Sequence, residues 1–255
     1  MRPPVPSSDR GRLVLVLGGT AVVVLLAVLV WAWLREQPVP GPTAPLDAAG
    51  PVLLVPGYGG GTDGVDQLAA ALRASGRQAE VVPIGDGTGD IRAYAATVLD
   101  RARAAVAAGA PSVDLVGFSM GGLVVRAAAT DPDAGGLVRR VATISSPHDG
   151  TAAAALGGLL GQCPTACQQM QPGSDLLDSL PGASAADRWL SVWSASDEVI
   201  RPADSSVLAG ATDVLLQSVC PGDVAHSGMV TSPQVAALVG GFLATGTAPA
   251  TCPAG

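Results

Sequence analysis

The 255-residue sequence is poor in aromatic and in charged side chains. It has only two Phe, two Tyr and four Trp, so Ala, Val, Leu and Gly must fill most of a core. The length suffices for one sizeable domain and does not by itself require two. Charged residues make up 14% of the chain, the formal net charge is −7, and no cluster of Lys or Arg follows residue 50. Because a phosphate backbone is bound by a basic surface, this composition excludes a nucleic-acid partner.

A long apolar run near the N-terminus has no charged residue between Leu13 and Leu34. A helix rises ~1.5 Å per residue, so this run would span about 30 Å, whereas the apolar part of a cleaved signal peptide has ~7–15 residues. More arginines precede the run than follow it, which places residues 1–12 in the cytoplasm. We therefore predict a transmembrane signal-anchor over residues 13–34. A long cleaved signal peptide is the alternative, and it would export the domain as well.

All four cysteines lie after the apolar run, at Cys163, Cys167, Cys220 and Cys252. An even number in an oxidising compartment indicates two disulfides. We favour Cys163–Cys167 and Cys220–Cys252 among the three pairings, because a bridge to Cys252 would tie down the C-terminal tail. Zinc is the rival interpretation, but neither histidine lies next to a cysteine and the spacings fit no common zinc finger. We expect no metal.

The rest of the chain divides into a linker and one domain. Residues 35–50 are rich in Pro and lack periodicity, as expected of a semi-extended linker. In residues 51–255 short apolar runs alternate with segments of helical character, which predicts an α/β domain with a parallel sheet flanked by helices. The expected strands are 52–55, 79–82, 113–116, 141–144, 190–193 and 214–218. The expected helices are 65–74, 91–108, 121–129 and 234–243.

Residues 151–184 differ from this alternating pattern. They are rich in Gly, Ala, Ser and Pro, hold two of the cysteines and contain no clear strand. The segment is either an excursion over a functional site or an irregular loop stapled by Cys163 and Cys167.

A serine flanked by glycines follows the expected strand 113–116. Gly117, Ser119 and Gly121 form a G-x-S-x-G pattern, and a helix-like segment comes directly after it. A serine on a sharp strand-to-helix turn has a strained backbone, and small residues two before and two after it relieve the crowding. The turn also places Ser119 at a helix N-terminus, which favours developing negative charge. Ser119 is therefore the predicted nucleophile; a fortuitous glycine-rich turn is the alternative.

A serine hydroxyl needs a base to take its proton, and the chain has two histidines. His226 follows the last expected strand and precedes the final helix, so a loop can carry it to Ser119. His148 comes directly after the strand that follows the nucleophile helix, which is the wrong place for the base in this chain order. We predict His226 as the base and His148 as a loop or cleft residue.

The acid should lie between the serine and the histidine, at the end of a strand. Asp197 follows the expected strand 190–193, where its carboxylate could fix the tautomer of the base and stabilise the imidazolium. Four other carboxylates are rivals and could equally be solvated surface groups: Glu198, Asp204, Asp213 and Asp223.

Acyl transfer also needs two N–H donors directed at the oxyanion. The backbone amide of Met120, directly after the serine, is the natural first donor. The second should come from the glycine-rich loop after the first strand, which makes Tyr58 the expected residue. The loop has neither G-x-x-x-x-G-K nor G-x-G-x-x-G, which weakens the alternative of a phosphate-binding loop.

These residues together resemble the small bacterial triacylglycerol lipases and esterases of the α/β-hydrolase superfamily. Four segments carry the likeness in the same order, at 52–60, 113–122, 194–200 and 226–235. The resemblance implies a three-layer α/β-hydrolase fold with a mostly parallel sheet, a triad of Ser119, Asp197 and His226, and an oxyanion hole at Tyr58 and Met120. Pro56 departs from the family, which usually has His there, so the efficiency of catalysis is open.

The resemblance implies a cofactor-independent serine hydrolase whose substrate is a lipid or small acyl ester. Two other functions stay open, because a triad of this kind serves many reactions. One is a cell-envelope acyltransferase, and the other is an exported binding module with little turnover. We expect a monomer held at the cell membrane by its N-terminal helix, with the domain outside the cytoplasm, or a secreted protein if the N-terminal segment is cleaved.

Overall fold

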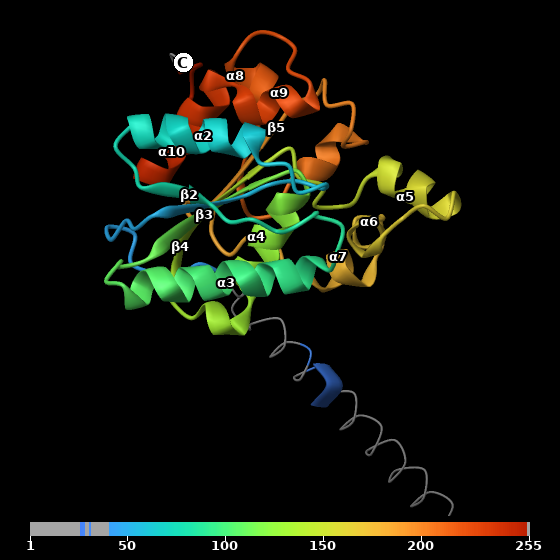
Figure 1. The fold of residues 1–255 in the computed structure, drawn as a ribbon, viewed down its shortest axis with the longest axis horizontal. Helices are drawn as coiled ribbons and strands as arrows, with labels where there is room; N and C mark the ends of the chain where they lie inside the picture. The colour runs from blue at the N-terminus through green and yellow to red at the C-terminus, as the bar shows by residue number, and fades with distance from the viewer. Residues whose placement is uncertain (1–25, 29–30, 32–40, 254–255) are drawn as a thin grey trace, which may run out of the picture. The chain divides into compact units, whose positions relative to one another are not determined.

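The structure, a computed structural model, describes residues 26–28, 31 and 41–253 (Figure 1). Contacts divide the chain into residues 1–38 and 39–255, and the fold described below is that of the second unit. Nowhere in the described ranges is there a helix long and apolar enough to cross a membrane. Most of the run 13–34 lies outside the described residues, so the signal-anchor stays a prediction.

The second unit is built on a six-stranded sheet in the order β2-β1-β3-β4-β5-β6. Every neighbouring pair of strands is parallel. The strands are β1 (Val52–Val55), β2 (Ala79–Val81), β3 (Val113–Phe118), β4 (Val138–Ile144), β5 (Trp189–Trp193) and β6 (Thr212–Leu215). All four residues of β1 and all seven of β4 are buried, as expected for strands covered on both faces.

The end of the last strand was predicted wrongly. The apolar run 214–218 was expected to be extended throughout, but the structure ends β6 at Leu215 and continues as helix α8 (Leu216–Val219). The backbone N–H of Cys220 donates to the carbonyl of Leu216 in this helical turn. Short apolar runs do not distinguish strand from helix, so their composition alone could not set this boundary.

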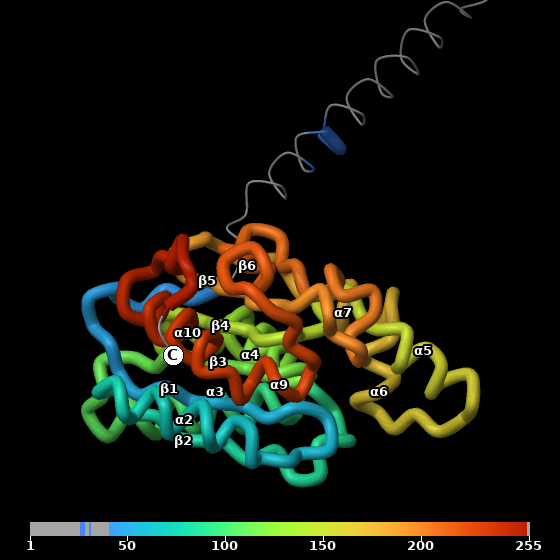
Figure 2. The backbone as a smooth tube through the Cα atoms, turned by 90° about the horizontal axis from the view of Figure 1, so that it is seen from above, coloured from blue at the N-terminus to red at the C-terminus, as the bar shows by residue number. Residues whose placement is uncertain are grey.

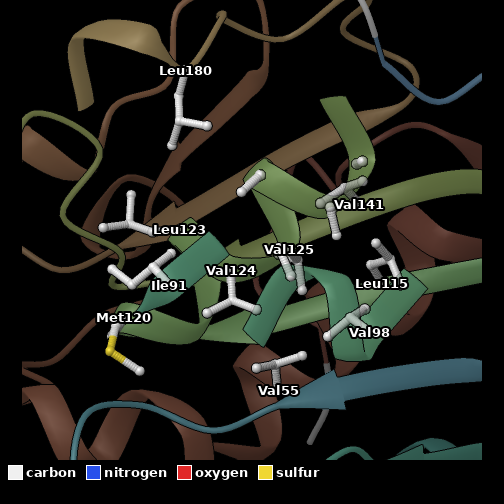
Figure 3. Packing of buried hydrophobic residues seen from close by; sticks show 14 of the residues in the cluster. Val55, Ile91, Val98, Leu115, Met120, Leu123, Val124, Val125, Val141 and Leu180 are labelled. Atoms are coloured by element: carbon white, nitrogen blue, oxygen red, sulfur yellow. The ribbon is translucent and has the colours of Figure 1, made fainter. Parts of the chain in front are cut away.

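Helices cover both faces of the sheet (Figure 1). On one face lie α2 (Asp63–Ala74), α9 (His226–Thr231) and α10 (Pro233–Thr245), and on the other lie α3 (Ile91–Ala107) and α4 (Met120–Thr130). Every residue of α4 is buried. Its Leu123, Val124 and Val125 meet side chains of β1, β3 and α3 in one core (Figure 3). The helix that follows Ser119 is therefore fixed on all sides.

Described residues of the predicted linker 35–50 contact the sheet. Ala44, expected in the linker, is 1% exposed, and its N–H donates to the carbonyl of Val138 at the start of β4. Arg188 donates to the carbonyl of Ala44, and Arg139 to that of Leu46. Apolar periodicity did not reveal these contacts, because they are made by the backbone.

A buried ion pair links the starts of β3 and β4. The carboxylate of Asp114 is fully buried and accepts from Arg139 Nε at 3.0 Å and Nη2 at 2.5 Å. Arg77 donates to the same carboxylate at 2.6 Å, and the backbone N–H of Arg140 does so at 3.1 Å. Arg139 also donates to the carbonyl of Leu243, so this group ties the sheet to the end of α10.

Replacing Asp114 by asparagine should destabilise the protein by about 3–5 kcal/mol, because it leaves the guanidinium of Arg139 buried without a counter-charge. Glu80→Gln is the matched control. It breaks an ion pair with Arg101 that is partly exposed, and such pairs contribute about 0–1 kcal/mol. Denaturant unfolding midpoints measure both changes, and equal small shifts would show that the buried group does not hold the sheet together.

Two alternatives were open for residues 151–184, and the structure has three short helices there rather than an irregular loop. They are α5 (Ala152–Leu159), α6 (Thr165–Gln169) and α7 (Asp175–Ser179), and α5 and α6 lie at one end of the domain in both views (Figures 1 and 2). Arg126 of α4 holds the end of this segment by donating to the carbonyls of Leu180 and Pro181. Burial lowers the pKa of Arg126 to about 10, which leaves it charged at neutral pH.

Both disulfides have the pairing favoured from the sequence. Cys163–Cys167 joins the chain between α5 and α6 to α6 itself. Cys220–Cys252 joins the end of α8 to the C-terminal tail and closes a span of 32 residues. No free cysteine occurs among the described residues.

Candidate active site

Ser119 lies at the turn from β3 to α4, with a φ of 54° and a ψ of −127°. A positive φ is strained for a residue with a side chain, so the surroundings must hold this conformation. Two glycines make room for the turn. A Cβ added to Gly117 would lie 2.2 Å from the carbonyl oxygen of Gly121, and one added to Gly121 would lie 2.3 Å from that of Val55. The close backbone contacts explain why the pattern has glycine at both positions.

Three side chains that the sequence singled out meet at this turn. The Oγ of Ser119 lies 3.0 Å from Nε2 of His226, and Nδ1 of His226 lies 2.7 Å from Oδ2 of Asp197. Asp197 is 1% exposed, and Ser119 and His226 are each 8% exposed. The three residues come from different segments. Ser119 lies in the β3–α4 turn, Asp197 in the loop after β5, and His226 in the first turn of α9. The structure thus forms one continuous hydrogen-bonded chain from carboxylate to hydroxyl.

The carboxylate of Asp197 is fixed from both sides. Its Oδ1 accepts from the backbone N–H of Val199 at 2.9 Å and of Ile200 at 2.8 Å, while Oδ2 faces His226. Burial alone would raise the pKa of Asp197, but the hydrogen bonds from His226, Ile200 and Val199 outweigh it and hold the pKa below its ordinary value. Asp197 is therefore ionised at neutral pH and accepts the Nδ1–H of His226.

The other histidine is placed elsewhere. His148 is 2% exposed, and its Nε2 lies 3.1 Å from Thr143 Oγ1 rather than near the serine. Burial lowers the pKa of His148 well below its ordinary value, and the charge of Arg126 lowers it further. His148 is thus a neutral buried residue in the turn after β4.

The four rival carboxylates have other contacts. Glu198 accepts from the backbone N–H of His226, and Asp223 accepts from the hydroxyl of Ser196. Asp213 accepts from the N–H of Leu208, and burial raises its pKa. Asp204 is exposed on the short turn after residue 202. Asp197 alone among the five has its carboxylate on the imidazole ring, within the described residues.

The residues expected to bind an oxyanion lie on either side of Ser119. Met120 is the first residue of α4, so its backbone N–H has no acceptor within the helix. The loop of Gly57 and Tyr58 passes directly against the serine, because a Cβ added to Gly57 would lie 3.0 Å from Ser119 Cβ. The side chain of Tyr58 is 44% exposed at the rim of the site.

A cavity of about 250 Å³ opens beside Ser119. Its walls are mostly apolar and come largely from α5, α6 and the loop after β5. They are formed by Tyr58, Ser119, Thr151, Ala153, Ala154, Gly157, Gln162, Cys167, Met170, Val199 and Ile200. Ser119 and Tyr58 were singled out from the sequence, but the wall residues of α5 and α6 were not, because residues 151–170 have no clear apolar period. In the described part of the chain, no group of three or more His, Cys, Asp or Glu is arranged to hold a metal ion.

The domain resembles the crystal structure of Bacillus licheniformis lipase BlEst2 in its mature form, with a TM-score of 0.63 and 19% sequence identity over 82% of this chain and 96% of that one. The chain has the α/β-hydrolase fold. A second solved structure, Aspergillus fumigatus lipase B, gives a TM-score of 0.64 and 18% identity over 81% of this chain. The match covers 55% of the fungal lipase, about half its length.

One protein-family model matches part of the sequence. The model of the PGAP1-like alpha/beta domain matches residues 89–160, which include β3, Ser119, α4 and β4. No curated protein sequence matches the chain at a significant level. The resemblance to α/β-hydrolase lipases inferred from the sequence is thus confirmed at the level of fold.

Proposed function

We propose that this α/β-hydrolase is a serine ester hydrolase in which Ser119, His226 and Asp197 form the catalytic triad. The proposal depends chiefly on the hydrogen-bonded chain that joins these residues beside an apolar cavity. The lipase names of its structural neighbours agree with an ester substrate. The residues required are all supplied by the chain, so the reaction needs no cofactor.

The first half of the reaction acylates the enzyme. Ser119 Oγ attacks the ester carbonyl carbon while Nε2 of His226 takes the hydroxyl proton. The backbone N–H groups of Met120 and Tyr58 donate to the oxyanion that forms, and Asp197 stabilises the imidazolium. As the intermediate collapses, His226 gives its proton to the leaving alcohol, and the acyl group stays on Ser119.

The second half returns the enzyme to its starting state. A water molecule takes the place of the alcohol, loses a proton to Nε2 of His226 and attacks the acyl carbon. Collapse of this second intermediate breaks the bond to Ser119 Oγ, which regains the proton from His226, and the carboxylic acid leaves. An alcohol in place of water would give acyl transfer instead, and product analysis with an added alcohol distinguishes the two.

The cavity supports an acyl ester as the substrate. Its lining by Ala154, Met170 and Ile200 offers apolar surface but no charged group to a substrate chain. Burial of each substrate methylene on such surface contributes about 0.8 kcal/mol. We accordingly propose that the acyl chain, rather than a charged headgroup, supplies most of the binding energy.

Hydrolysis of p-nitrophenyl esters tests this proposal. The full-length protein in detergent should hydrolyse an acyl series from acetate to palmitate, and KM should fall as the chain lengthens until the cavity is full. The matching anilides provide a control, because they present the same acyl chain on a poorer leaving group. A folded protein with both disulfides formed that hydrolyses no member of the series would overturn the proposed function.

We also propose that the domain works outside the cytoplasm, where its two disulfides are stable. The apolar run 13–34 would hold it at the membrane as a single-pass anchor. Protease added to intact cells should then degrade the domain, whereas a protected domain would contradict export by an anchored route.

A further inference from the structure

The loop that leads to the base, called the base loop below, has little structure of its own. Residues 221–225, which lie between α8 and α9, have no regular secondary structure. Pro221, Gly222 and Asp223 are exposed. Segments with many exposed residues and few buried apolar contacts are the first to open in a folded protein. His226 nevertheless has to be held 3.0 Å from Ser119, which requires contacts from outside the loop.

Those contacts come from the loop that carries the acid. Ser194 Oγ donates to the carbonyl of Val224 at 2.6 Å, and Ser196 Oγ donates to the carboxylate of Asp223 at 2.7 Å. Glu198 Oε2 accepts from the backbone N–H of His226 at 2.9 Å. Ser194 and Ser196 before Asp197, and Glu198 after it, thus contact three of the four residues 223–226.

Ser194 is the centre of this set. It is fully buried, and its Oγ also accepts from Gln217 Nε2 at 2.8 Å and from the backbone N–H of Ser196 at 3.1 Å. A serine hydroxyl has one donor and two acceptor positions, so all three are occupied. Because both acceptor positions are taken, the hydroxyl hydrogen must point at Val224, and the rotamer of Ser194 is fixed.

We propose that Ser194 is a positioning residue for the base, holding the His226 loop against the Asp197 loop so that acid and base move as one unit. This role rests on the proposed ester hydrolase function. Ser194 touches neither the substrate nor the reacting atoms, and acts through the carbonyl of Val224, two residues before His226. Glu198 assists it from the other side by accepting from the N–H of His226.

Loss of the hydrogen bond from Ser194 to Val224 should slow the chemical step. Misplacement of a catalytic group by about 1 Å can lower the rate 100-fold, while the acyl chain still binds the same cavity. Ser194→Ala should therefore lower kcat at least tenfold and leave KM within twofold of the wild-type value.

Ser191 of β5, three residues before Ser194, provides a control. It is also fully buried, and its Oγ also donates to a backbone carbonyl at 2.6 Å, but that carbonyl belongs to Ser206 and not to the base loop. Ser194→Ala removes three hydrogen bonds and Ser191→Ala removes one, so the melting temperature of each variant is measured beside its kcat. Only Ser194→Ala should lower kcat. Equal effects of the two variants on kcat, or no effect of Ser194→Ala, would overturn the positioning role.

The low-field NMR signal of the His226 Nδ1 proton gives a readout that does not require turnover. In wild-type full-length protein it should be sharp, and Asp197→Asn should remove it, which assigns it. In Ser194→Ala it should broaden or exchange faster, while in Ser191→Ala it should match wild type. An unchanged signal in Ser194→Ala contradicts the positioning role. Failure of the wild type to hydrolyse any ester would instead contradict the proposed function, so the two failures are distinguishable.

Glu198 supplies a test by conservative replacement. Glu198→Gln keeps an oxygen that can accept from the N–H of His226, whereas Glu198→Ala removes it. The alanine variant should lose several-fold in kcat and the glutamine variant should recover most of it. If alanine and glutamine behave alike, the hydrogen bond from Glu198 to the base loop plays no part in positioning.

Discussion

Replacing Ser119 by alanine should lower kcat/KM for ester hydrolysis by about 10⁴-fold or more, because it removes the atom that forms the acyl-enzyme. Binding should change little, since the cavity walls and the turn are otherwise kept. Background hydrolysis supported by the oxyanion donors alone would then be all that remains. Initial rates with a p-nitrophenyl ester measure the loss.

Ser146→Ala is the control for this substitution. Ser146 is also a buried serine near the carboxyl end of the sheet, but its Oγ donates to the carbonyl of Ile144 rather than facing a histidine. It should keep activity within a few-fold of wild type. Undiminished turnover in Ser119→Ala with the fold intact would mean that Ser119 is not the nucleophile.

Asp197→Asn should lower kcat by about 10⁴-fold without unfolding the protein, as expected when the partner of a catalytic histidine is changed to an amide. The oxygen of the new side chain can still accept from the N–H groups of Val199 and Ile200. Its NH₂ group would then face Nδ1 of His226, and the ring would have to accept there. The remaining proton would lie on Nε2, which could no longer take one from Ser119.

The control for the acid is Asp204→Asn, which removes one exposed carboxylate from the same stretch of chain. It should leave kcat within twofold of the wild-type value. Circular dichroism and the melting temperature check that Asp197→Asn is folded. If Asp197→Asn retains full activity, the acid must be another residue, and Glu198, which contacts the backbone of His226, would be examined next.

The parts of the site that could be predicted are those whose signal is local in sequence. Gly117, Ser119 and Gly121 lie within five residues, and the strand before them and the helix after them are each apolar enough to be recognised. All six strands were expected near their observed positions, and for β1, β3, β4 and β5 the reason is that buried parallel strands give apolar runs. His226 and Asp197 followed from chain order.

What could not be predicted depends on partners far apart in the chain. Helix α5 buries only Ala154, so it has no apolar period to mark it, and two glycines interrupt its helix-favouring run of alanines. Ser194 lies 30 residues from Val224 and 23 from Gln217, and nothing in its own neighbourhood indicates that it bridges two loops. The walls of the cavity escaped prediction for the same reason.

Mass spectrometry of the acyl-enzyme tests the central claim most directly. The full-length protein is mixed with a slowly hydrolysed p-nitrophenyl ester, quenched in acid and digested. The account predicts one acyl group per chain, on the peptide that contains Ser119, together with its absence in Ser119→Ala. Release of p-nitrophenol with no acyl adduct, or an adduct on another residue that persists in Ser119→Ala, would contradict it.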